Sequence, residues 1–207
     1  MRDVVGRRDR GVRRRQLVEA AYKVLAERGS EETRISDIAE RAGVASSLVS
    51  YYFPSKDDLL LEATRFGMDR FFVQRSRVLA KIEDPLERLE SAVRWAMPVG
   101  PKDPDWTVLM EFWTRALRRA PLQTVATLFQ ARAHSMYASI VDAIRADGRC
   151  NPVASSDTIA NWIVAMLDGL AIRVIMHDPA IDAEEMERLA VDFARLAVGA
   201  LAAEGTS

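Results

Sequence analysis

Residues 33–56 read TRISDIAERAGVASSLVSYYFPSK and decide the fold class of this 207-residue chain. Apolar residues recur at helical spacing on each side of Gly43, so we expect two short helices joined by a tight turn, the second over 46–53. A longer helix precedes them over about 11–28 and ends at Gly29. A long helix followed by two short ones with a glycine in the turn is typical of a helix-turn-helix.

The rest of the chain has helical periodicity and almost no strand-like alternation. The strongest start signal is Asp84 as N-cap, followed by Pro85 and by Glu87 in the third position. Thr33 is the expected N-cap of the first short helix. Further helices are expected over 56–81, 85–97, 105–119, 122–147, 157–176 and 183–203. The sequence therefore predicts an all-α fold of nine helices without a sheet.

The composition is that of a globular protein, with 49% apolar and 29% charged residues. The single cysteine, Cys150, excludes an internal disulfide and a multi-thiolate metal site, and it fits a reducing compartment. The most apolar stretch, 162–176, contains Asp168 and Arg173 and is too short to cross a bilayer. We therefore expect a cytoplasmic protein without a membrane segment.

The net charge is only −1, but the charges are unevenly distributed. Residues 1–56 carry 12 Lys and Arg against 8 Asp and Glu, whereas the remainder carries 17 against 22. The arginines before position 16 are Arg2, Arg7, Arg8, Arg10, Arg13, Arg14 and Arg15. This asymmetry indicates nucleic-acid contact, while a solvated, disordered tail explains the arginine-rich start equally well.

The helix expected over 46–53 has two different faces, if each residue advances it by about 100°. The apolar face consists of Leu48, Val49, Tyr52 and Phe53. The opposite face is small, hydroxylated and free of acidic charge, and it consists of Ser46, Ser47, Ser50 and Tyr51. Such a face can enter a major groove without repelling phosphates, although an ordinary amphipathic helix has the same pattern.

Residues 33–44, followed by Tyr52-Phe53-Pro54-Ser55-Lys56, resemble the DNA-binding signature of the tetracycline-repressor (TetR) family. The resemblance covers about residues 11–60 and implies a dimeric, all-α protein of two domains. In that scheme, 1–56 form an arginine-rich arm and a three-helix DNA-binding domain, and 57–207 form a helical ligand-binding and dimerisation domain. Ser50 departs from the family, which usually has a tyrosine there, and Tyr51 stands where a histidine is frequent. The run around Ser50 and the segments 167–173 and 182–185 are more loosely similar to the choline-pathway repressor branch.

The residues expected to contact DNA are Thr33, Arg34, Ser36, Ser46, Ser47, Ser50, Tyr51, Tyr52 and Lys56. The first three begin the helix that crosses the DNA backbone in this architecture. The serines are the expected readers of base edges, with helix capping as the alternative role of Ser46. Lys56 begins the next helix, where its ammonium and the terminal amides can share a phosphate.

The C-terminal region is interpreted as a sensor. All four tryptophans lie there, and aromatic and thioether side chains recur at helical spacing. The candidate ligand-binding residues are Trp95, Met110, Trp113, Phe129, Tyr137, Trp162 and Met166. Core packing explains each of them individually, whereas an apolar cavity explains them collectively. Because the carboxylates of Glu111, Asp142 and Asp168 lie on the same helices, a cation with apolar surface is one expected class of ligand.

The helices expected over 157–176 and 183–203 have wider apolar faces than a surface helix needs. The family resemblance implies a symmetric four-helix dimer interface there, and burial within one protomer is the alternative.

The sequence offers little for catalysis. Its two histidines, His134 and His177, lie 43 positions apart, and no metalloprotease, phosphate-loop or nucleophile-elbow motif is present. We therefore expect no enzyme, no cofactor and no metal. The predicted function is a ligand-responsive homodimeric regulator, most simply a repressor that binds a palindromic double-stranded operator and is released by a small hydrophobic inducer. The alternative is an all-α small-molecule-binding enzyme or a scaffold without DNA binding.

Overall fold

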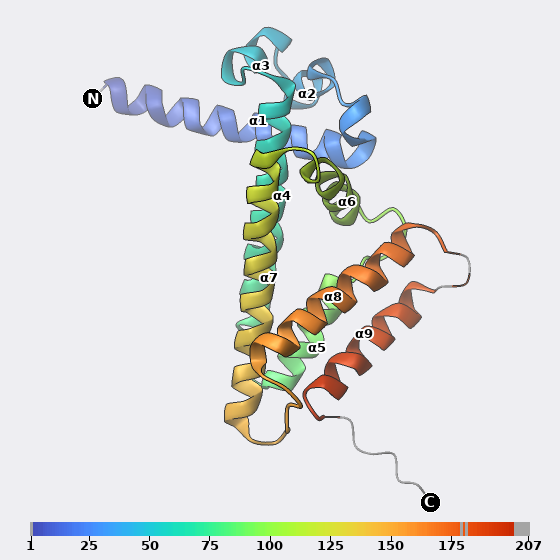
Figure 1. Cartoon of the computed structure of the whole chain (residues 1–207). Coiled ribbons are helices and arrows are strands. Elements are labelled where there is room, and N and C mark those ends of the chain that lie inside the picture. The colour runs from blue at the N-terminus through green and yellow to red at the C-terminus, as the bar shows by residue number, and fades with distance from the viewer. Residues whose placement is uncertain (1, 179, 181, 201–207) are drawn as a thin grey trace, which may run out of the picture. The chain divides into compact units, whose positions relative to one another are not determined.

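The computed structural model describes residues 2–178, 180 and 182–200, and over these ranges the chain folds into nine α-helices without a strand (Figure 1). The helices are α1 (Arg2–Glu32), α2 (Ile35–Ala42), α3 (Ser46–Tyr52), α4 (Lys56–Leu79), α5 (Pro85–Ala96), α6 (Pro104–Ala116), α7 (Ala120–Asp147), α8 (Ser156–Ile175) and α9 (Ala183–Ala197). The predicted all-α class with nine helices is confirmed for these residues.

Two helix starts differ from the predicted ones by more than one residue. α1 begins at Arg2 instead of residue 11, so the arginine-rich start is helical and not the tail that its composition suggested. Opposite charges stand four positions apart there, as at Asp9 and Arg13, and this spacing favours a helix. α7 begins at Ala120 and includes Pro121, because a proline in the first turn lacks only an N–H that has no intrahelical partner anyway.

Helix termini follow from their capping residues. The predicted cap at Asp84 is confirmed, because its Oδ1 accepts the N–H groups of Leu86 (2.8 Å) and Glu87 (3.0 Å). The predicted cap at Thr33 is wrong, since the extended N-cap residue of α2 is Arg34. α9 ends at Ala197, and the remainder of the expected helix lies partly in 201–207, outside the described residues.

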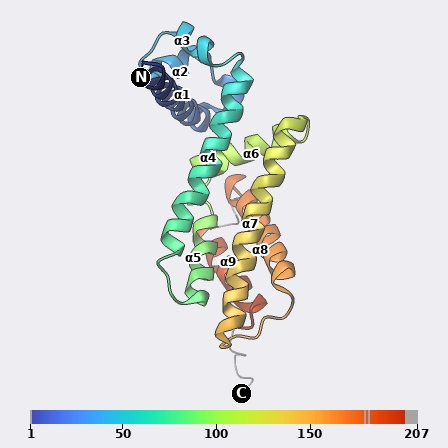
Figure 2. The same ribbon diagram turned by 90° about the vertical axis from the view of Figure 1, so that its left-hand side faces the viewer.

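By packing, the chain divides into two compact units. Unit 1 contains residues 1–71 and 107–125, and unit 2 contains residues 72–106 and 126–207. This division differs from the functional boundary predicted at residue 56, which stays a prediction. In unit 1, α1, α2 and α3 pack together (Figure 2). The start of α4 joins their core, in which the largest fully buried side chains are Leu17, Val24, Ile38, Val49, Leu59 and Leu60.

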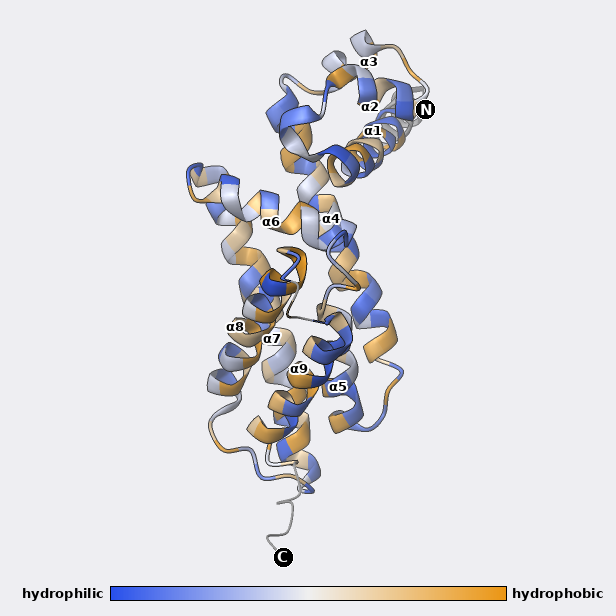
Figure 3. Cartoon of the chain, turned by 90° about the vertical axis from the view of Figure 1, so that its right-hand side faces the viewer, coloured by the Kyte–Doolittle hydropathy of each residue, from blue (hydrophilic) through white to orange (hydrophobic). Residues whose placement is uncertain are grey.

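In unit 2, α9 packs beside α5 and α8 (Figure 3). Its core draws on α5, α7, α8 and α9, and the largest fully buried side chains are Leu89, Val93, Tyr137, Ile144, Ile159 and Ile163. Each of these helices turns one apolar stripe inward, because burying such a stripe stabilises an amphipathic helix. Because each unit has its own core, the candidate functional residues belong to two separate packing units.

Candidate nucleic-acid interface and sensor unit

The recognition face of α3 has the composition predicted from the sequence. Ser46, Ser47, Ser50 and Tyr51 are exposed, and Tyr51 is 69% exposed. On the opposite face, Val49 and Phe53 are buried. Ala45 and not Ser46 occupies the N-cap position, without a side-chain cap, so the Ser46 hydroxyl is not used for capping. α3 therefore presents three hydroxyls and a phenol outward, held on an apolar base.

An arginine from α1 fixes the end of α3. The Arg14 guanidinium donates to the backbone carbonyl of Tyr52 (2.8 Å), lies 4.3 Å from the centroid of the Phe53 ring and pairs with Glu62 of α4. The Tyr52 ring in turn meets the Tyr51 ring edge-on, with centroids 5.3 Å apart. In the sequence Arg14 is one of seven arginines before position 16, and no local signal distinguishes it, because its partners lie 38 to 48 positions away.

At the start of α2, the three residues predicted to contact DNA differ in their exposure. Arg34 and Ser36 are exposed and open to phosphate oxygens. The Arg34 N–H donates to the carboxylate of Asp37 (3.0 Å), which holds the first turn. Thr33, in contrast, is 1% exposed, and its hydroxyl donates to the carbonyl of Gly29 (2.5 Å). In this structure its side chain stabilises the corner before α2 and does not reach the surface.

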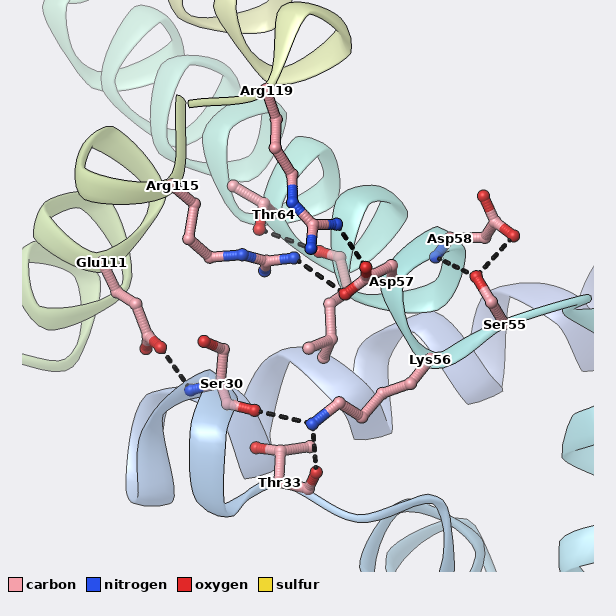
Figure 4. A network of polar contacts seen from close by, with 11 residues as sticks. Ser30, Thr33, Ser55, Lys56, Asp57, Asp58, Thr64, Glu111, Arg115 and Arg119 are labelled. Atoms are coloured by element: carbon pink, nitrogen blue, oxygen red, sulfur yellow. Dashed lines mark hydrogen bonds and ion pairs between the residues drawn. The ribbon is translucent and has the colours of Figure 1, made fainter. Parts of the chain in front are cut away.

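Lys56 begins α4 as predicted, but its ammonium is partly committed within the protein (Figure 4). Its Nζ donates to the carbonyls of Ser30 (2.9 Å) and Thr33 (3.1 Å). An ammonium has three N–H groups, so one remains for a phosphate. Lys56 thus links α4 to the corner between α1 and α2, a role that the sequence did not indicate.

α6 belongs to unit 1 from residue 107, and α6 together with the residues that follow it makes three further polar contacts, also drawn in Figure 4. The Glu111 carboxylate accepts the backbone N–H of Ser30. Arg115 (3.1 Å) and Arg119 beyond the end of α6 both pair with Asp57. The hydrogen bond from Arg119 lowers the pKa of the Asp57 carboxyl, and the charge of Arg115 adds to that effect.

The predicted ligand-binding residues fall in both units. Met110 and Trp113 belong to unit 1, and the other five belong to unit 2. Tyr137 is buried and donates its hydroxyl to the carbonyl of Ala92 (3.1 Å). The Phe129 ring packs on Phe72, with centroids 5.1 Å apart.

The remaining three candidates of unit 2 differ in exposure. Trp95 and Trp162 are 39% and 42% exposed, and Met166 is half-buried. Two exposed tryptophans do not line a closed cavity within one chain, so the seven candidates do not form one cluster within either unit.

Two charged groups are partly buried in unit 2. Burial raises the pKa of Asp168 on α8 to about 6, although a hydrogen bond from Gln130 opposes the shift. Burial lowers the pKa of Arg75 on α4 to about 10, and its guanidinium donates to the carbonyl of Trp95. Both charges act on the Tyr137 hydroxyl, whose pKa burial raises.

Asp168 stands out among the three carboxylates that the sequence placed near apolar stripes. Glu111 is used in unit 1, and Asp142 is exposed and accepts the Ser156 hydroxyl (2.5 Å). Asp168 is partly buried and makes no ion pair with any residue that the structure describes. A carboxyl in that position is an acceptor for a cationic group.

α8 presents an apolar stripe to the outside. Trp162, Ile172 and Met176 are exposed at helical spacing, and Gly169 lies on the same stripe, where an added Cβ would meet nothing within 4 Å. On α9, Leu189 and Leu196 are exposed one heptad apart. Exposed apolar stripes are typical of surfaces that meet another molecule or lipid.

By length and composition, α8 could also cross a membrane. A packed helix of a water-soluble protein passes that test as well, and the charged side chains of Asp168 and Arg173 lie in its second half.

Comparisons with known proteins agree with this anatomy. Residues 17–63 match the family description "Bacterial regulatory proteins, tetR family", and residues 85–198 match "BetI-type transcriptional repressor, C-terminal". The chain is 28% identical to the HTH-type transcriptional regulator BetI 1 of Chromohalobacter salexigens, over 88% of either chain. It is 27% identical to BetI of Rhizobium meliloti, over 88% of this chain and 87% of that one.

Among solved structures, the chain resembles a transcriptional regulator from Saccharomonospora viridis in complex with choline. The TM-score is 0.79 and the identity 29%, over 87% of this chain and 94% of that one. A TetR regulator from Haloarcula marismortui shares the fold, with a TM-score of 0.79 at 21% identity.

These relatives are transcriptional regulators, so the predicted class is confirmed and the enzyme or scaffold alternative gains no support. This chain belongs to the tetR family of bacterial regulatory proteins, and its C-terminal part is that of a BetI-type transcriptional repressor.

Proposed function

We propose that the protein acts in the cytoplasm as a homodimer that binds a near-palindromic operator through residues 1–56 and is released by a small molecule held by residues 57–207. The outward face of α3 carries this proposal: Ser46, Ser47, Ser50 and Tyr51 are exposed, and none is acidic. A single recognition helix reads only a short half-site, so a symmetric pair is needed for specificity.

Within this interface the residues have different tasks. Ser47 and Ser50 read base edges, with Ser46 and Tyr51 at the margins of the same face. Arg34, Ser36 and the free N–H of Lys56 hold phosphates, and Tyr52 acts through its ring against Tyr51. Thr33 contributes through the corner that it stabilises.

The N-terminal part of α1 adds exposed positive charge to unit 1. Arg10, Arg13 and Arg15 are exposed on it. Basic side chains that neutralise phosphates raise affinity for all sequences alike and make it fall with salt. We propose that this segment strengthens binding without selecting the site. Deleting residues 1–10 should weaken binding most at low salt and leave the preferred sequence unchanged.

The dimer forms through the exposed stripes of α8 and α9. Trp162, Ile172, Met176, Leu189 and Leu196 would be buried there, which explains why two large helices leave apolar side chains in water. Trp162 then serves the dimer more directly than the ligand. Gly169 has no side chain to hold the partner helix away.

The inducer is proposed to be a small cation with apolar surface, bound in unit 2 with Asp168 as its counter-charge. Asp168 is partly buried without a cationic partner in the described chain, and the aromatic rings of Phe129 and Tyr137 belong to the same unit. Aromatic faces and a carboxylate both attract a quaternary ammonium. The similar regulator from Saccharomonospora viridis was crystallised with choline, a cation of this class.

Selection from a randomised duplex pool tests the DNA part of the proposal. We expect two symmetric half-sites whose centres lie about 34–36 Å apart, or a whole number of turns further. Recovery of single asymmetric half-sites would contradict the dimeric reading. The inducer part is tested by screening cationic, neutral and anionic apolar compounds for release of the selected duplex, together with tryptophan fluorescence. If only carboxylates release it, the cationic class is wrong while the sensor remains.

A further inference from the structure

The backbone of Ser30 is held on both sides by charged side chains from other helices. Its N–H donates to the Glu111 carboxylate of α6, and its carbonyl accepts from the Lys56 ammonium of α4 at 2.9 Å (Figure 4). Ser30 is itself buried. One backbone residue therefore joins three helices of unit 1.

This contact exists because α1 is broken at Gly29. Gly29 has φ 74° and ψ 172°, a conformation outside the helix. The break takes the Ser30 N–H away from its ordinary carbonyl partner four residues earlier, and a buried donor left unpaired is unfavourable. Glu111 supplies the missing acceptor and lies so close that a Cβ on Gly29 would stand 3.3 Å from its Oε2.

The corner held in this way leads directly into the DNA-binding helices. Thr33 returns to Gly29 through both its N–H (3.2 Å) and its hydroxyl, and its carbonyl accepts the second hydrogen bond from Lys56. The next residue, Arg34, is the N-cap of α2, and α2 packs on α3. The position of the Ser30 backbone thus decides where α2 begins.

α6 is anchored so that Glu111 stays in place. One turn further along, Arg115 pairs with Asp57, which immediately follows Lys56 in the sequence. α6 therefore contacts the start of α4 through the Arg115 cation and the break in α1 through the Glu111 anion. The two opposite contacts fix both its position and its rotation, because residues four apart share one face of the helix.

We propose that Glu111 is a positioning residue for operator binding: it sets the corner between α1 and α2, and through it the recognition helix, without touching DNA. The proposal rests on the DNA binding proposed above. It assigns a role to a residue of α6, outside residues 17–63 that match the family's DNA-binding description.

Operator affinity of Glu111→Gln and Glu111→Leu, measured over a range of salt concentrations, tests this role. Glutamine keeps an oxygen that accepts the Ser30 N–H, whereas leucine has a similar size and no acceptor. We expect Glu111→Leu to weaken binding about tenfold with an unchanged salt slope and site preference, and Glu111→Gln to stay within about threefold of the parent. Thr114→Ala, an exposed change on the same helix, should leave binding unchanged.

Amide hydrogen exchange of the free protein supplies a readout that does not depend on DNA. In Glu111→Leu, the Ser30 amide should exchange much faster than in the parent, while amides in the middle of α1 keep their protection. Unchanged exchange at Ser30, or equal losses of affinity in the two Glu111 variants, would overturn the proposal. If the parent binds no duplex, the proposed function fails, while the exchange result still decides whether Glu111 holds the corner.

Discussion

The guanidinium of Arg14 and the backbone carbonyl of Tyr52 lie 2.8 Å apart, although 38 positions separate them in the sequence. The carbonyl belongs to the last residue of the recognition helix, whose final carbonyls have no intrahelical partner. A cation at this end also complements the helix dipole. One arginine of a basic segment is thereby a structural support of α3, and its neighbours are not.

Substitutions of Arg14 and Arg13 should consequently have different effects. We expect Arg14→Ala to lower the melting temperature and the operator affinity together, because it removes the hydrogen bond to Tyr52 and the contact with Phe53. Arg13→Ala should leave the melting temperature unchanged and reduce the salt slope by about 1 if Arg13 meets a phosphate. Thermal melts and salt titrations of both variants decide this, and equal melting temperatures would contradict the support role of Arg14.

The serines of α3 and Lys56 provide a second contrast. Ser50→Ala or Ser47→Ala should change the preference among operators with little change in salt slope, because each removes only a neutral hydroxyl. Lys56→Ala should weaken binding to all operators and lower the slope by about 1. It should also destabilise the fold, since two carbonyls lose their donor. A change of sequence preference in Lys56→Ala without a change of slope would show that the roles are misassigned.

Asp168 should make stability depend on pH in an uncommon direction. Its folded pKa of about 6 exceeds its unfolded value, so the folded state binds the proton more tightly, and stability falls as pH rises from about 4 to above 6. The difference between the folded and unfolded pKa values corresponds to roughly 3 kcal/mol of stability. Asp168→Asn should remove this loss, so that the variant is more stable than the parent at pH 8. Urea titrations at pH 4.5 and 8 measure the effect, and Asp142→Asn is the exposed control.

The same carboxyl predicts how ligand affinity varies with pH. A bound cation favours the ionised form, so affinity for a cationic inducer should rise as pH passes through 6 and then level off. Below pH 6, binding of the cation should release the proton from the Asp168 carboxyl. Calorimetry in buffers of different ionisation enthalpy measures this proton. Equal affinity of the parent and Asp168→Asn for the cation would refute the proposed counter-charge.

Gly169 tests the dimer. In the isolated chain an added side chain meets nothing within 4 Å, so Gly169→Trp should fold, and Gly169→Ala should gain about 0.5–1 kcal/mol of helix stability. If the stripe of α8 faces a second copy, Gly169→Trp should shift the protein to monomer and abolish operator binding. Sedimentation at several concentrations measures this. Ser135→Trp, at an exposed position of α7, is the matched control, and a dimer unaffected by Gly169→Trp would place the interface elsewhere.

The features that the sequence could predict are those with local causes. Asp84 caps α5 because its own side chain reaches the next two amides, and Gly29 breaks α1 because it adopts a positive φ at little steric expense. The two faces of α3 follow from helical spacing alone. Each of these signals lies within a few residues of the structure that it determines.

The features that sequence analysis missed depend on residues distant along the chain. Glu111 meets Ser30 across 81 positions, and Arg14 meets Tyr52 across 38. In the sequence, a charged residue on an amphipathic helix has the same pattern around it whether it faces solvent or a buried amide. No sequence pattern therefore distinguishes the two environments. Thr33 illustrates the same limit. Threonine is a frequent N-cap residue, but in the folded chain the residues around Thr33 bury its side chain.

Unit 1 is assembled from two separate stretches of sequence, 1–71 and 107–125. A gene fragment that stops after the third or fourth helix would lack Val108, a member of the core around α1, and the carboxylate that completes the Ser30 backbone. Recombination between relatives faces the same constraint. A chimera that borrows the operator specificity of another repressor should therefore carry the donor's counterpart of 107–125 along with its first helices, or the exchanged parts will meet at a junction that neither parent was selected to form.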